Sequence, residues 1–467
     1  ACLSRRRPRV RVPSLPPIMN DIFNIAKNFF EIGEKYFSEK NFEEADKNFN
    51  LSLKYIPDRV STLINLGLCK IKQKKFDECL AIINKLYSLN DNSFDFMNLQ
   101  SLYYGGTSQF KKAIDVIESM LLKKNISKQD LSNLYNYQGI AYSKLKQYHK
   151  SIKLQQKSID ANSSNYDALC NLGFNNLTIG NFQEGWKYYE YRLLRNNLNI
   201  SKYPKDITEL KNKKVLIRPE QGLGDIIQFS RFLPELLNYT NQIDVIIPPA
   251  LENLFNYKNL NFIRHSANIL NHYDYEIFIG SLPYLLKKFE KFENEGIAFN
   301  EDIFKNKTSL KSNINTFQIG LAWSGNSKFG YDHLRSLDLR KLEKLFLLRE
   351  LNLKFFCLQK DLKNHDKDFL DKMKVDYLGN LNFYNLAKKI INFDLIISSD
   401  TSILHLASSL GIKTYGMISY VPDWRWMADG EHSNWYKSLK LYRQPKLFDW
   451  DNVIDRIVRD LKIKTVN

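Results

Sequence analysis

The pattern of apolar and polar positions changes character near residue 200. Between about residues 20 and 195, apolar side chains recur at spacings of three and four, the period of amphipathic helices. From about residue 213 onward, short runs rich in Val, Ile and Phe alternate with helical segments, which is typical of buried strands in a parallel sheet. The pattern predicts a helical part followed by an α/β part.

The helical part also repeats itself. Small residues recur every 34 positions, with four additional residues before the fourth: Gly33, Gly67, Ser101, Gly139 and Gly173. Small side chains at these slots let paired helices approach closely, while large apolar side chains fill the seam. The register resembles tetratricopeptide repeats, and an unrelated helix bundle is the alternative. We expect a superhelical array over residues 20–200, sealed at its end by aromatic side chains: Trp186, Tyr188, Tyr189 and Tyr191.

The α/β part divides into two sets of strands. Predicted strands of the first set are Lys213–Arg218, Ile243–Ile247, Phe262–Arg264 and Glu276–Ile279, with a helix at Ile226–Leu237. Predicted strands of the second set are 317–323, 353–359, 375–379, 393–397 and 414–418, with helices at Leu339–Leu348, Phe383–Ile391 and Trp450–Leu461. The aromatic-rich stretch 421–444 is predicted to be a loop. Two Rossmann-like layers result, and ligands of such layers lie at the carboxyl ends of the strands.

Two strand-to-helix turns carry candidate chemistry. Asp400, Thr401 and Ser402 stand where a buried strand turns into a helix, and His405 follows on the first turns of that helix. Unpaired backbone N–H groups and the helix dipole favour an anion at such a helix start. A capped helix with a satisfied histidine is the alternative.

The second turn follows the first strand of the α/β part. Gly222 and Gly224 permit a tight turn whose backbone is open to a ligand, and Asp225 falls where the next helix begins. The turn lacks the third glycine of the dinucleotide-binding fingerprint. A plain N-terminal cap is the alternative role for Asp225.

Composition narrows the function classes. The chain has 467 residues, enough for two or three domains. Its five cysteines are scattered and show no metal-ligand spacing, a pattern that predicts a reducing, cytoplasmic location and no metal site. No apolar run is long enough for a transmembrane helix. The net charge of +17 includes an arginine cluster in residues 1–18, which we interpret as a disordered tail or as sequence upstream of Met19. The remaining excess is dispersed lysine, which argues against nucleic-acid binding but allows contact with acidic substrates or lipid headgroups.

Several motifs occur in an order that resembles a known family. The motifs are EQGLGDIIQF at 220–229, GLAWSGN at 320–326, RSL at 335–337, CLQK at 357–360, SDTSILHLASSLG at 399–411, DWRW at 423–426, WY at 435–436 and RQ at 443–444. Together with the repeats they resemble bacterial tetratricopeptide-repeat proteins whose C-terminal domain is akin to glycosyltransferase family 9, the heptosyltransferases. The resemblance covers about residues 20–465. It implies an α plus α/β fold: a repeat superhelix followed by a GT-B-type pair of Rossmann-like domains at 211–310 and 315–465, the second of which binds the donor.

The resemblance implies an inverting, metal-independent sugar transfer from a nucleotide-sugar, which is a co-substrate rather than a cofactor. A carboxylate must take the proton of the acceptor hydroxyl, and cations and helix N-termini must stabilise the departing diphosphate. By position, Asp225 matches the family's proposed general base, with Gly222 and Gly224 in its loop. Asp400, Thr401, Ser402 and His405 match the phosphate and sugar site.

This chain departs from the family pattern at two places. Ser402 replaces the usual glycine after Asp-Thr, where it could crowd the phosphate, and the basic K-R-W-P stretch is absent. We assign its role to Arg335, and pairing with Asp332 or Asp338 is the alternative.

Further residues are candidates for the donor site. Trp323 and Asn326 would shape the donor pocket, with core packing as the alternative for Trp323. Lys360 would reach the diphosphate or face solvent. Arg425 would face either the substrate or the domain seam.

Two functions from different classes remain open. The first is a glycosyltransferase that modifies a protein or a cell-envelope glycan. The second is a non-catalytic repeat scaffold with a degenerate GT-B domain. The groove of the array would bind a protein or peptide, or the array would act as a spacer or dimer surface. The enzyme reading requires Asp225 to face the corner formed by Asp400 and His405 across a single interdomain cleft.

Overall fold

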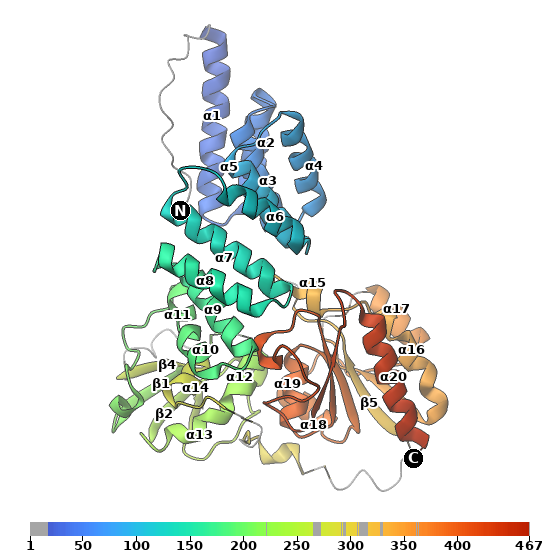
Figure 1. The fold of residues 1–467 in the computed structure, drawn as a ribbon. Coiled ribbons are helices and arrows are strands. Elements are labelled where there is room, and N and C mark those ends of the chain that lie inside the picture. Colours follow the sequence, from blue (N-terminus) through green and yellow to red (C-terminus); the bar gives the residue numbers. More distant parts are fainter. Residues whose placement is uncertain are drawn as a thin grey trace. The chain divides into compact units, whose positions relative to one another are not determined.

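The computed structural model describes residues 17–220, 222–264, 272–290, 292, 296–305, 307, 316–326, 330–360, 362 and 364–466. The chain forms two compact units, one ending at Ser163 and the other beginning at Ser164 (Figure 1). The predicted disordered tail, residues 1–18, lies outside the described residues except for Pro17 and Ile18, which begin the first helix. No helix of the described ranges combines the length and the apolar character that crossing a membrane requires.

The first unit is built from successive helix pairs. Its helices are α1 (Pro17–Ser38), α2 (Phe42–Tyr55), α3 (Val60–Lys72), α4 (Phe76–Ser88), α5 (Phe94–Gly106), α6 (Phe110–Leu121), α7 (Lys128–Lys144) and α8 (Tyr148–Ala161). The repeat glycines lie at helix contacts: an ideal Cβ on Gly33 would fall 2.6 Å from the Phe49 ring, and one on Gly67 would fall 2.7 Å from Leu99. The predicted helical repeat, with small residues at close approaches, is confirmed.

The second unit opens with one more pair of helices. These are α9 (Tyr166–Thr178) and α10 (Phe182–Tyr189), followed by the short α11 (Arg192–Arg195). An ideal Cβ on Gly173 would meet the Tyr189 backbone nitrogen at 2.7 Å, so the two helices cross backbone to backbone. Trp186 and Tyr189 are fully buried against the α/β part, as the aromatic seal predicted.

A four-stranded parallel sheet follows, with the order β3-β2-β1-β4. Its strands are β1 (Lys214–Arg218), β2 (Gln242–Ile246), β3 (Asn261–Ile263) and β4 (Tyr275–Phe278). Short helices connect them: α12 (Leu223–Phe229), α13 (Leu233–Leu236) and α14 (Leu282–Leu285), with 3-10 turns η1 (Ile207–Leu210), η2 (Ser230–Phe232), η3 (Pro249–Leu251), η5 (Ile279–Ser281) and η6 (Glu301–Ile303). This sheet and its connections are called the first half below.

A six-stranded parallel sheet forms the second half, with the order β10-β9-β8-β5-β6-β7. Its strands are β5 (Phe317–Ala322), β6 (Leu353–Cys357), β7 (Asp376–Tyr377), β8 (Leu395–Ser399), β9 (Thr414–Ile418) and β10 (Leu439–Arg443). Its helices are α15 (Asp332–Arg335), α16 (Glu343–Phe346), α17 (Asn364–Lys372), α18 (Phe383–Ile390), α19 (Ser402–Ser409) and α20 (Trp450–Val466), with 3-10 turns η7 (Leu339–Leu342), η8 (Leu347–Leu351) and η9 (Trp424–Trp426). Two parallel-sheet α/β regions are therefore present, and their topology is compatible with the predicted Rossmann-like layers.

The structure corrects two sequence expectations. The stretch 421–444 is not a continuous loop, because Leu439–Arg443 forms the edge strand β10, which pairs in parallel with β9. Its apolar residues Leu439, Leu441 and Tyr442 are buried, although the aromatic residues before them obscure the strand pattern. The helices expected at Ile226–Leu237 and Leu339–Leu348 are each broken into α and 3-10 segments. Pro234, which lacks a backbone donor, stands inside the first of these.

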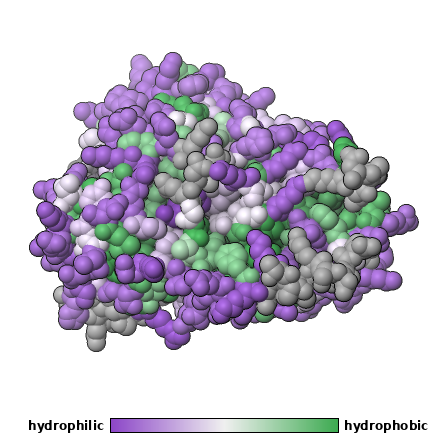
Figure 2. Space-filling view, turned by 90° about the horizontal axis from the view of Figure 1, so that it is seen from below, coloured by the Kyte–Doolittle hydropathy of each residue, from purple (hydrophilic) through white to green (hydrophobic). Residues whose placement is uncertain are grey.

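The hydrophobic core of the second unit runs through both halves. One cluster joins Trp186 of α10 and Phe229 of α12 with Trp424 and Trp435 of the second half. Trp186 makes edge-on ring contacts with the other three, at centroid distances of 6.2, 5.2 and 6.5 Å for Phe229, Trp424 and Trp435. Hydrophilic side chains dominate the face shown in Figure 2, with hydrophobic ones between them. The two halves are thus held together by a shared aromatic core that includes α10.

Candidate functional site

The two candidate turns meet. The first lies between β1 and α12 and the second between β8 and α19, and α12 packs against α19. The contact is close, because an ideal Cβ on Gly224 would fall 2.6 Å from Cδ2 of His405. Each turn follows the carboxyl end of a parallel strand, β1 in the first sheet and β8 in the second, and the two turns converge although they are 175 residues apart in the sequence. The Asp225 turn and the Asp400–His405 turn therefore lie together at the seam, as expected, but at Gly224 the two halves are in direct contact rather than separated by the cleft that the enzyme hypothesis requires.

Asp225 is held by both halves of the unit. Its Oδ2 accepts a hydrogen bond from the Gly222 backbone N–H at 2.8 Å, so the carboxylate caps its own helix. Its Oδ1 accepts a hydrogen bond from Nη2 of Arg425 at 2.5 Å. Burial raises the pKa of the Asp225 carboxyl, while the Arg425 charge acts in the opposite direction. The capping role that the sequence left open is present, and the ion pair adds to it.

Arg425 is buried at the seam between the halves. Nε donates to Oε1 of Gln228 at 2.9 Å and Nη1 donates to Oδ1 of Asp423 at 2.8 Å, while the guanidinium lies 4.3 Å from the centre of the Trp424 ring. Burial opposes its charge, but the carboxylates of Asp225 and Asp423 outweigh burial and raise the pKa of Arg425. Of the two orientations that the sequence allowed, Arg425 adopts the one toward the seam, where it binds the candidate base.

Asp400 lies at the end of β8, directly before the helix start. Thr401 is the N-cap residue of α19 with extended backbone, and its hydroxyl lies 3.1 Å from the Ser398 hydroxyl. Burial raises the pKa of Asp400 to about 6; repulsion from Asp423 adds to the shift and Arg335 opposes it. Ser402 begins α19 and is partly exposed. A carboxyl that is half protonated near pH 6 can both donate and accept a proton under ordinary conditions.

His405 is buried on the second turn of α19. Its Nδ1 lies 2.8 Å from the Tyr436 hydroxyl, and its ring packs on Trp426 with centroids 5.2 Å apart. Burial lowers the pKa of His405 well below its usual value, and Arg425, Arg231 and Arg335 lower it further. The imidazole is therefore neutral near pH 7, and its surroundings carry a positive potential.

The remaining predicted residues are distributed around this point. Nε of Arg335 donates to Oδ1 of Asp332 at 3.0 Å, which is the pairing alternative, although its charge also reaches Asp400. Trp323 is 3% exposed within the core of the second half, as its packing alternative predicted. Asn326 and Lys360 are exposed. Among the described residues, no group of three or more His, Cys, Asp or Glu side chains is arranged to hold a metal ion.

Several residues at the seam were not predicted from the sequence. Nη1 of Arg231 donates to the backbone oxygens of Phe292 and Trp435, at 2.9 and 2.7 Å, and so ties the halves together. Tyr436 fixes the His405 ring. The WY motif contained Tyr436, but nothing in the sequence pairs it with His405. Nε of Arg231 donates to the nearby Gln228 backbone oxygen at 2.8 Å, but the two acceptors that link the halves are backbone atoms remote in sequence, so the sequence gives no signal for that link.

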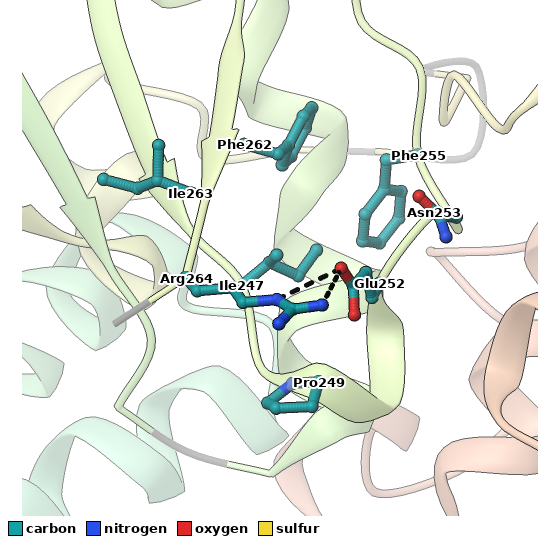
Figure 3. A pocket seen from close by; sticks show the side chains of 8 residues that line it. All are labelled: Ile247, Pro249, Glu252, Asn253, Phe255, Phe262, Ile263 and Arg264. Carbon is teal, nitrogen blue, oxygen red and sulfur yellow. Dashed lines mark hydrogen bonds and ion pairs between the residues drawn. The ribbon is translucent and has the colours of Figure 1, made fainter. Parts of the chain in front are cut away.

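A separate hollow lies beyond the carboxyl ends of β2 and β3 (Figure 3). It has a volume of about 140 Å³, and Phe255 and Phe262 form part of its wall with ring centroids 6.0 Å apart. Arg264 donates to Oε1 of Glu252 at 2.6 Å across it. The hollow combines an aromatic surface with a charged pair and belongs to the first half alone.

Comparison with known proteins gives a likeness for the helical part. Similar solved structures include MamA from Desulfovibrio magneticus RS-1 (19% identity, TM-score 0.30, 38% of this chain and 95% of that chain). They also include TTC0263, a thermophilic TPR protein of Thermus thermophilus (15%, 0.33, 37% and 92%), and YrrB, titled a TPR protein with an unusual peptide-binding site (11%, 0.29, 38% and 89%). No family model and no curated protein matches the chain. At these TM-scores and identities the likeness supports no conclusion about activity, and the glycosyltransferase resemblance stays a prediction from the sequence.

Proposed function

We propose that the chain is a glycosyltransferase that transfers a sugar from a nucleotide-sugar to a protein or a cell-envelope glycan. The observation that supports this proposal best is the meeting of the Asp225 turn and the Asp400–His405 turn at the seam of two parallel sheets. The Asp225 carboxyl, whose pKa is raised by burial, is suited to act as a base. The start of α19 and the nearby arginines are suited to bind an anion. The inverting, metal-independent course is the one that the family resemblance implies.

Asp225 acts as the general base. In the reaction, the acceptor hydroxyl attacks the anomeric carbon, the bond from that carbon to the diphosphate breaks, and the hydroxyl proton passes to Asp225. Gly222 and Arg425 each occupy one lone pair of the carboxylate, and a carboxylate offers about four such sites, so capacity for the substrate proton remains. Burial strengthens the base, and the Arg425 hydrogen bond fixes its direction.

The departing nucleoside diphosphate is stabilised from the second half. Thr401 and Ser402 stand at the start of α19, where the backbone N–H groups lack helical partners. Arg335 and Arg425 supply positive charge at the same place, and their charge adds to the burial that lowers the pKa of His405. A neutral His405 at this position can donate or accept a hydrogen bond without adding charge.

The partners and the location follow from the same proposal. The nucleotide-sugar is a co-substrate, and the groove of the repeat array binds a protein or peptide. We place the protein in the cytoplasm, where nucleotide-sugars are made, with no nucleic-acid partner. A non-catalytic scaffold is the second candidate, and it is favoured by the ion pair that occupies Asp225 and by Ser402 in place of glycine.

The test combines donor binding with turnover on the full chain. A thermal-shift screen of nucleotide-sugars identifies the donor, because a ligand that binds only the folded state raises stability by mass action. Release of nucleoside diphosphate then measures transfer for wild type and for Asp225→Asn. We expect the variant to bind donor as wild type does and to lose turnover by about 100-fold or more.

Asp206→Asn is the matched control. Asp206 is an exposed carboxylate of the same half that also caps a helical turn, through the Thr208 backbone N–H. Its replacement should leave turnover unchanged. Full turnover by Asp225→Asn would remove the base assignment, and failure of every nucleotide-sugar to bind wild type would favour the scaffold.

A further inference from the structure

A buried arginine connects the last turn of the helical array to the start of the candidate active-site loop. Arg192 of α11 is 1% exposed. Its Nε and Nη2 donate to the two carboxylate oxygens of Glu220, at 2.9 and 2.6 Å, in the forked geometry that only arginine offers. Nη1 donates to Oε1 of Glu190 at 2.6 Å, and Nη2 also donates to Oγ of Ser281 at 2.7 Å. All three polar ends of the guanidinium are thus used.

The Glu220 carboxylate is fixed as firmly as the arginine. Its side chain is 1% exposed, and Oε1 also accepts a hydrogen bond from the Gly280 backbone N–H at 3.2 Å. An ideal Cβ on Gly280 would fall 2.8 Å from that oxygen, so only glycine leaves room for the carboxylate there. Glu220 precedes Gly222 by two positions, and Gly222 caps α12 and holds Asp225. The start of α12 is therefore anchored through Glu220 to α11 and η5.

The neighbouring helix α10 supports the Asp225 carboxylate through its other oxygen, Oδ1. Trp186 of α10 contacts Phe229 of α12 and Trp424, with ring centroids 6.2 and 5.2 Å away. Trp424 in turn lies under the guanidinium of Arg425, which binds Asp225. Helix α11 therefore anchors the loop whose Gly222 binds Oδ2 of Asp225, and helix α10 contacts the tryptophan that lies against Arg425, which binds Oδ1.

We propose that Arg192 is a positioning residue for the Asp225 carboxylate, acting through its bidentate pair with Glu220. The pair contributes position rather than net stability, because a buried ion pair can usually be replaced by packed apolar groups at little cost. A carboxylate that must lie within hydrogen-bond reach of an acceptor hydroxyl is sensitive to displacements of about 1 Å, which can cost about 100-fold in rate. The catalytic consequence rests on the proposed function, but the anchoring of the α12 start does not.

The experiment uses full-length Arg192→Lys, Arg192→Met and the double variant Arg192→Met/Glu220→Met. Hydrogen exchange of the amides in residues 223–229 is the first readout, and donor turnover is the second. We expect Arg192→Met to raise exchange there at least tenfold and to lower kcat by about 10- to 100-fold with a donor KM within threefold of wild type. Arg192→Lys keeps the charge and should recover part of kcat. The double variant removes both members of the bidentate pair, and Glu190 keeps its hydrogen bond from the Tyr203 hydroxyl, so this variant is the one best able to fold. It should nevertheless stay slow, with the acid limb of its pH–rate profile displaced.

Lys70→Met is the matched control. Lys70 is a buried cation bound to Asp46 and Glu78 at 2.6 and 2.5 Å in the first unit. Its loss should destabilise its own unit without altering exchange in residues 223–229. Folded Arg192 variants with wild-type exchange and wild-type kcat would overturn the proposal. If wild type turns over no nucleotide-sugar while Arg192→Met still raises exchange at residues 223–229, the proposed function fails and the anchoring of that loop stands.

Discussion

Gly224 provides a sharp test of how the two halves meet. In Gly224→Ala, the added Cβ would lie 2.6 Å from Cδ2 and 3.4 Å from Cγ of His405. Contacts below 3.0 Å force something to move, and the His405 ring has little freedom because Tyr436 holds Nδ1 and Trp426 packs on its face. The substitution therefore pushes α12 and α19 apart.

Two effects of opposite sign decide the magnitude. Alanine is favoured over glycine in a helix by at most about 1 kcal/mol, and by less in the first turn, where Gly224 lies. Overpacking a well-filled contact costs about 1–3 kcal/mol. We expect Gly224→Ala to lower the free energy of unfolding of the second unit by about 1–2 kcal/mol. In a His405→Ala background the ring is gone, and the same substitution should become neutral or favourable, a coupling of about 1 kcal/mol or more.

Tryptophan fluorescence during urea unfolding measures this effect selectively. All six tryptophans lie at or beyond position 186, so their signal reports the second unit alone. Gly105→Ala is the control, and its unfolding is followed by far-ultraviolet circular dichroism because all tryptophans lie in the second unit. Gly105 also lies in a helix, α5, but a Cβ there meets nothing within 4 Å, so the change should be neutral or stabilising in the first unit. A Gly224→Ala chain as stable as wild type, or no coupling to His405, would refute the close contact.

Two further predictions concern charge and helix packing. The folded pKa of Asp400 is about 6 against a reference value of 3.8, so the free energy of unfolding should fall by up to about 3 kcal/mol as the pH rises from about 4 through 6. Urea unfolding at about pH 4.5 and 7.5 measures this pH dependence, which Asp400→Asn should remove. An unchanged pH dependence in the variant would contradict the assignment. Gly173→Ala should cost about 3 kcal/mol in the same assay, since its Cβ would meet the Tyr189 backbone, which cannot yield as a side chain can; a neutral effect would mean that α9 and α10 do not cross there.

The contacts of Arg425 change how the proposed chemistry is understood. A base held by a buried guanidinium is oriented but also restrained, because the ion pair favours the charged carboxylate while burial disfavours it. The same guanidinium binds Gln228 of the first half. Any movement of one half against the other must therefore alter the environment of Asp225, which links the geometry of the seam to its basicity.

Local sequence pattern was sufficient for the repeating helices and for most strands. The spacing of Gly33 and Gly67 records where helices touch, and runs such as Leu395–Ser399 are buried on both faces, so neighbours in sequence carry the signal. The two candidate turns were also found this way, because strand, glycine or hydroxyl, and helix follow one another along the chain. β10 was missed because aromatic and glycine-containing sequence before it hides a short edge strand.

Only the tertiary structure decided what the charged residues do. Asp225 and Arg425 are 200 positions apart, and Arg231 reaches a backbone oxygen 204 positions away. Such pairs depend on the distance between folded layers and on burial, which removes water and makes each partner essential to the other. The sequence named Asp225, Asp400 and His405 as candidates, but their neighbours, their protonation and the anchoring of the α12 start by Arg192 arise only when the two sheets and the last helices of the array pack together.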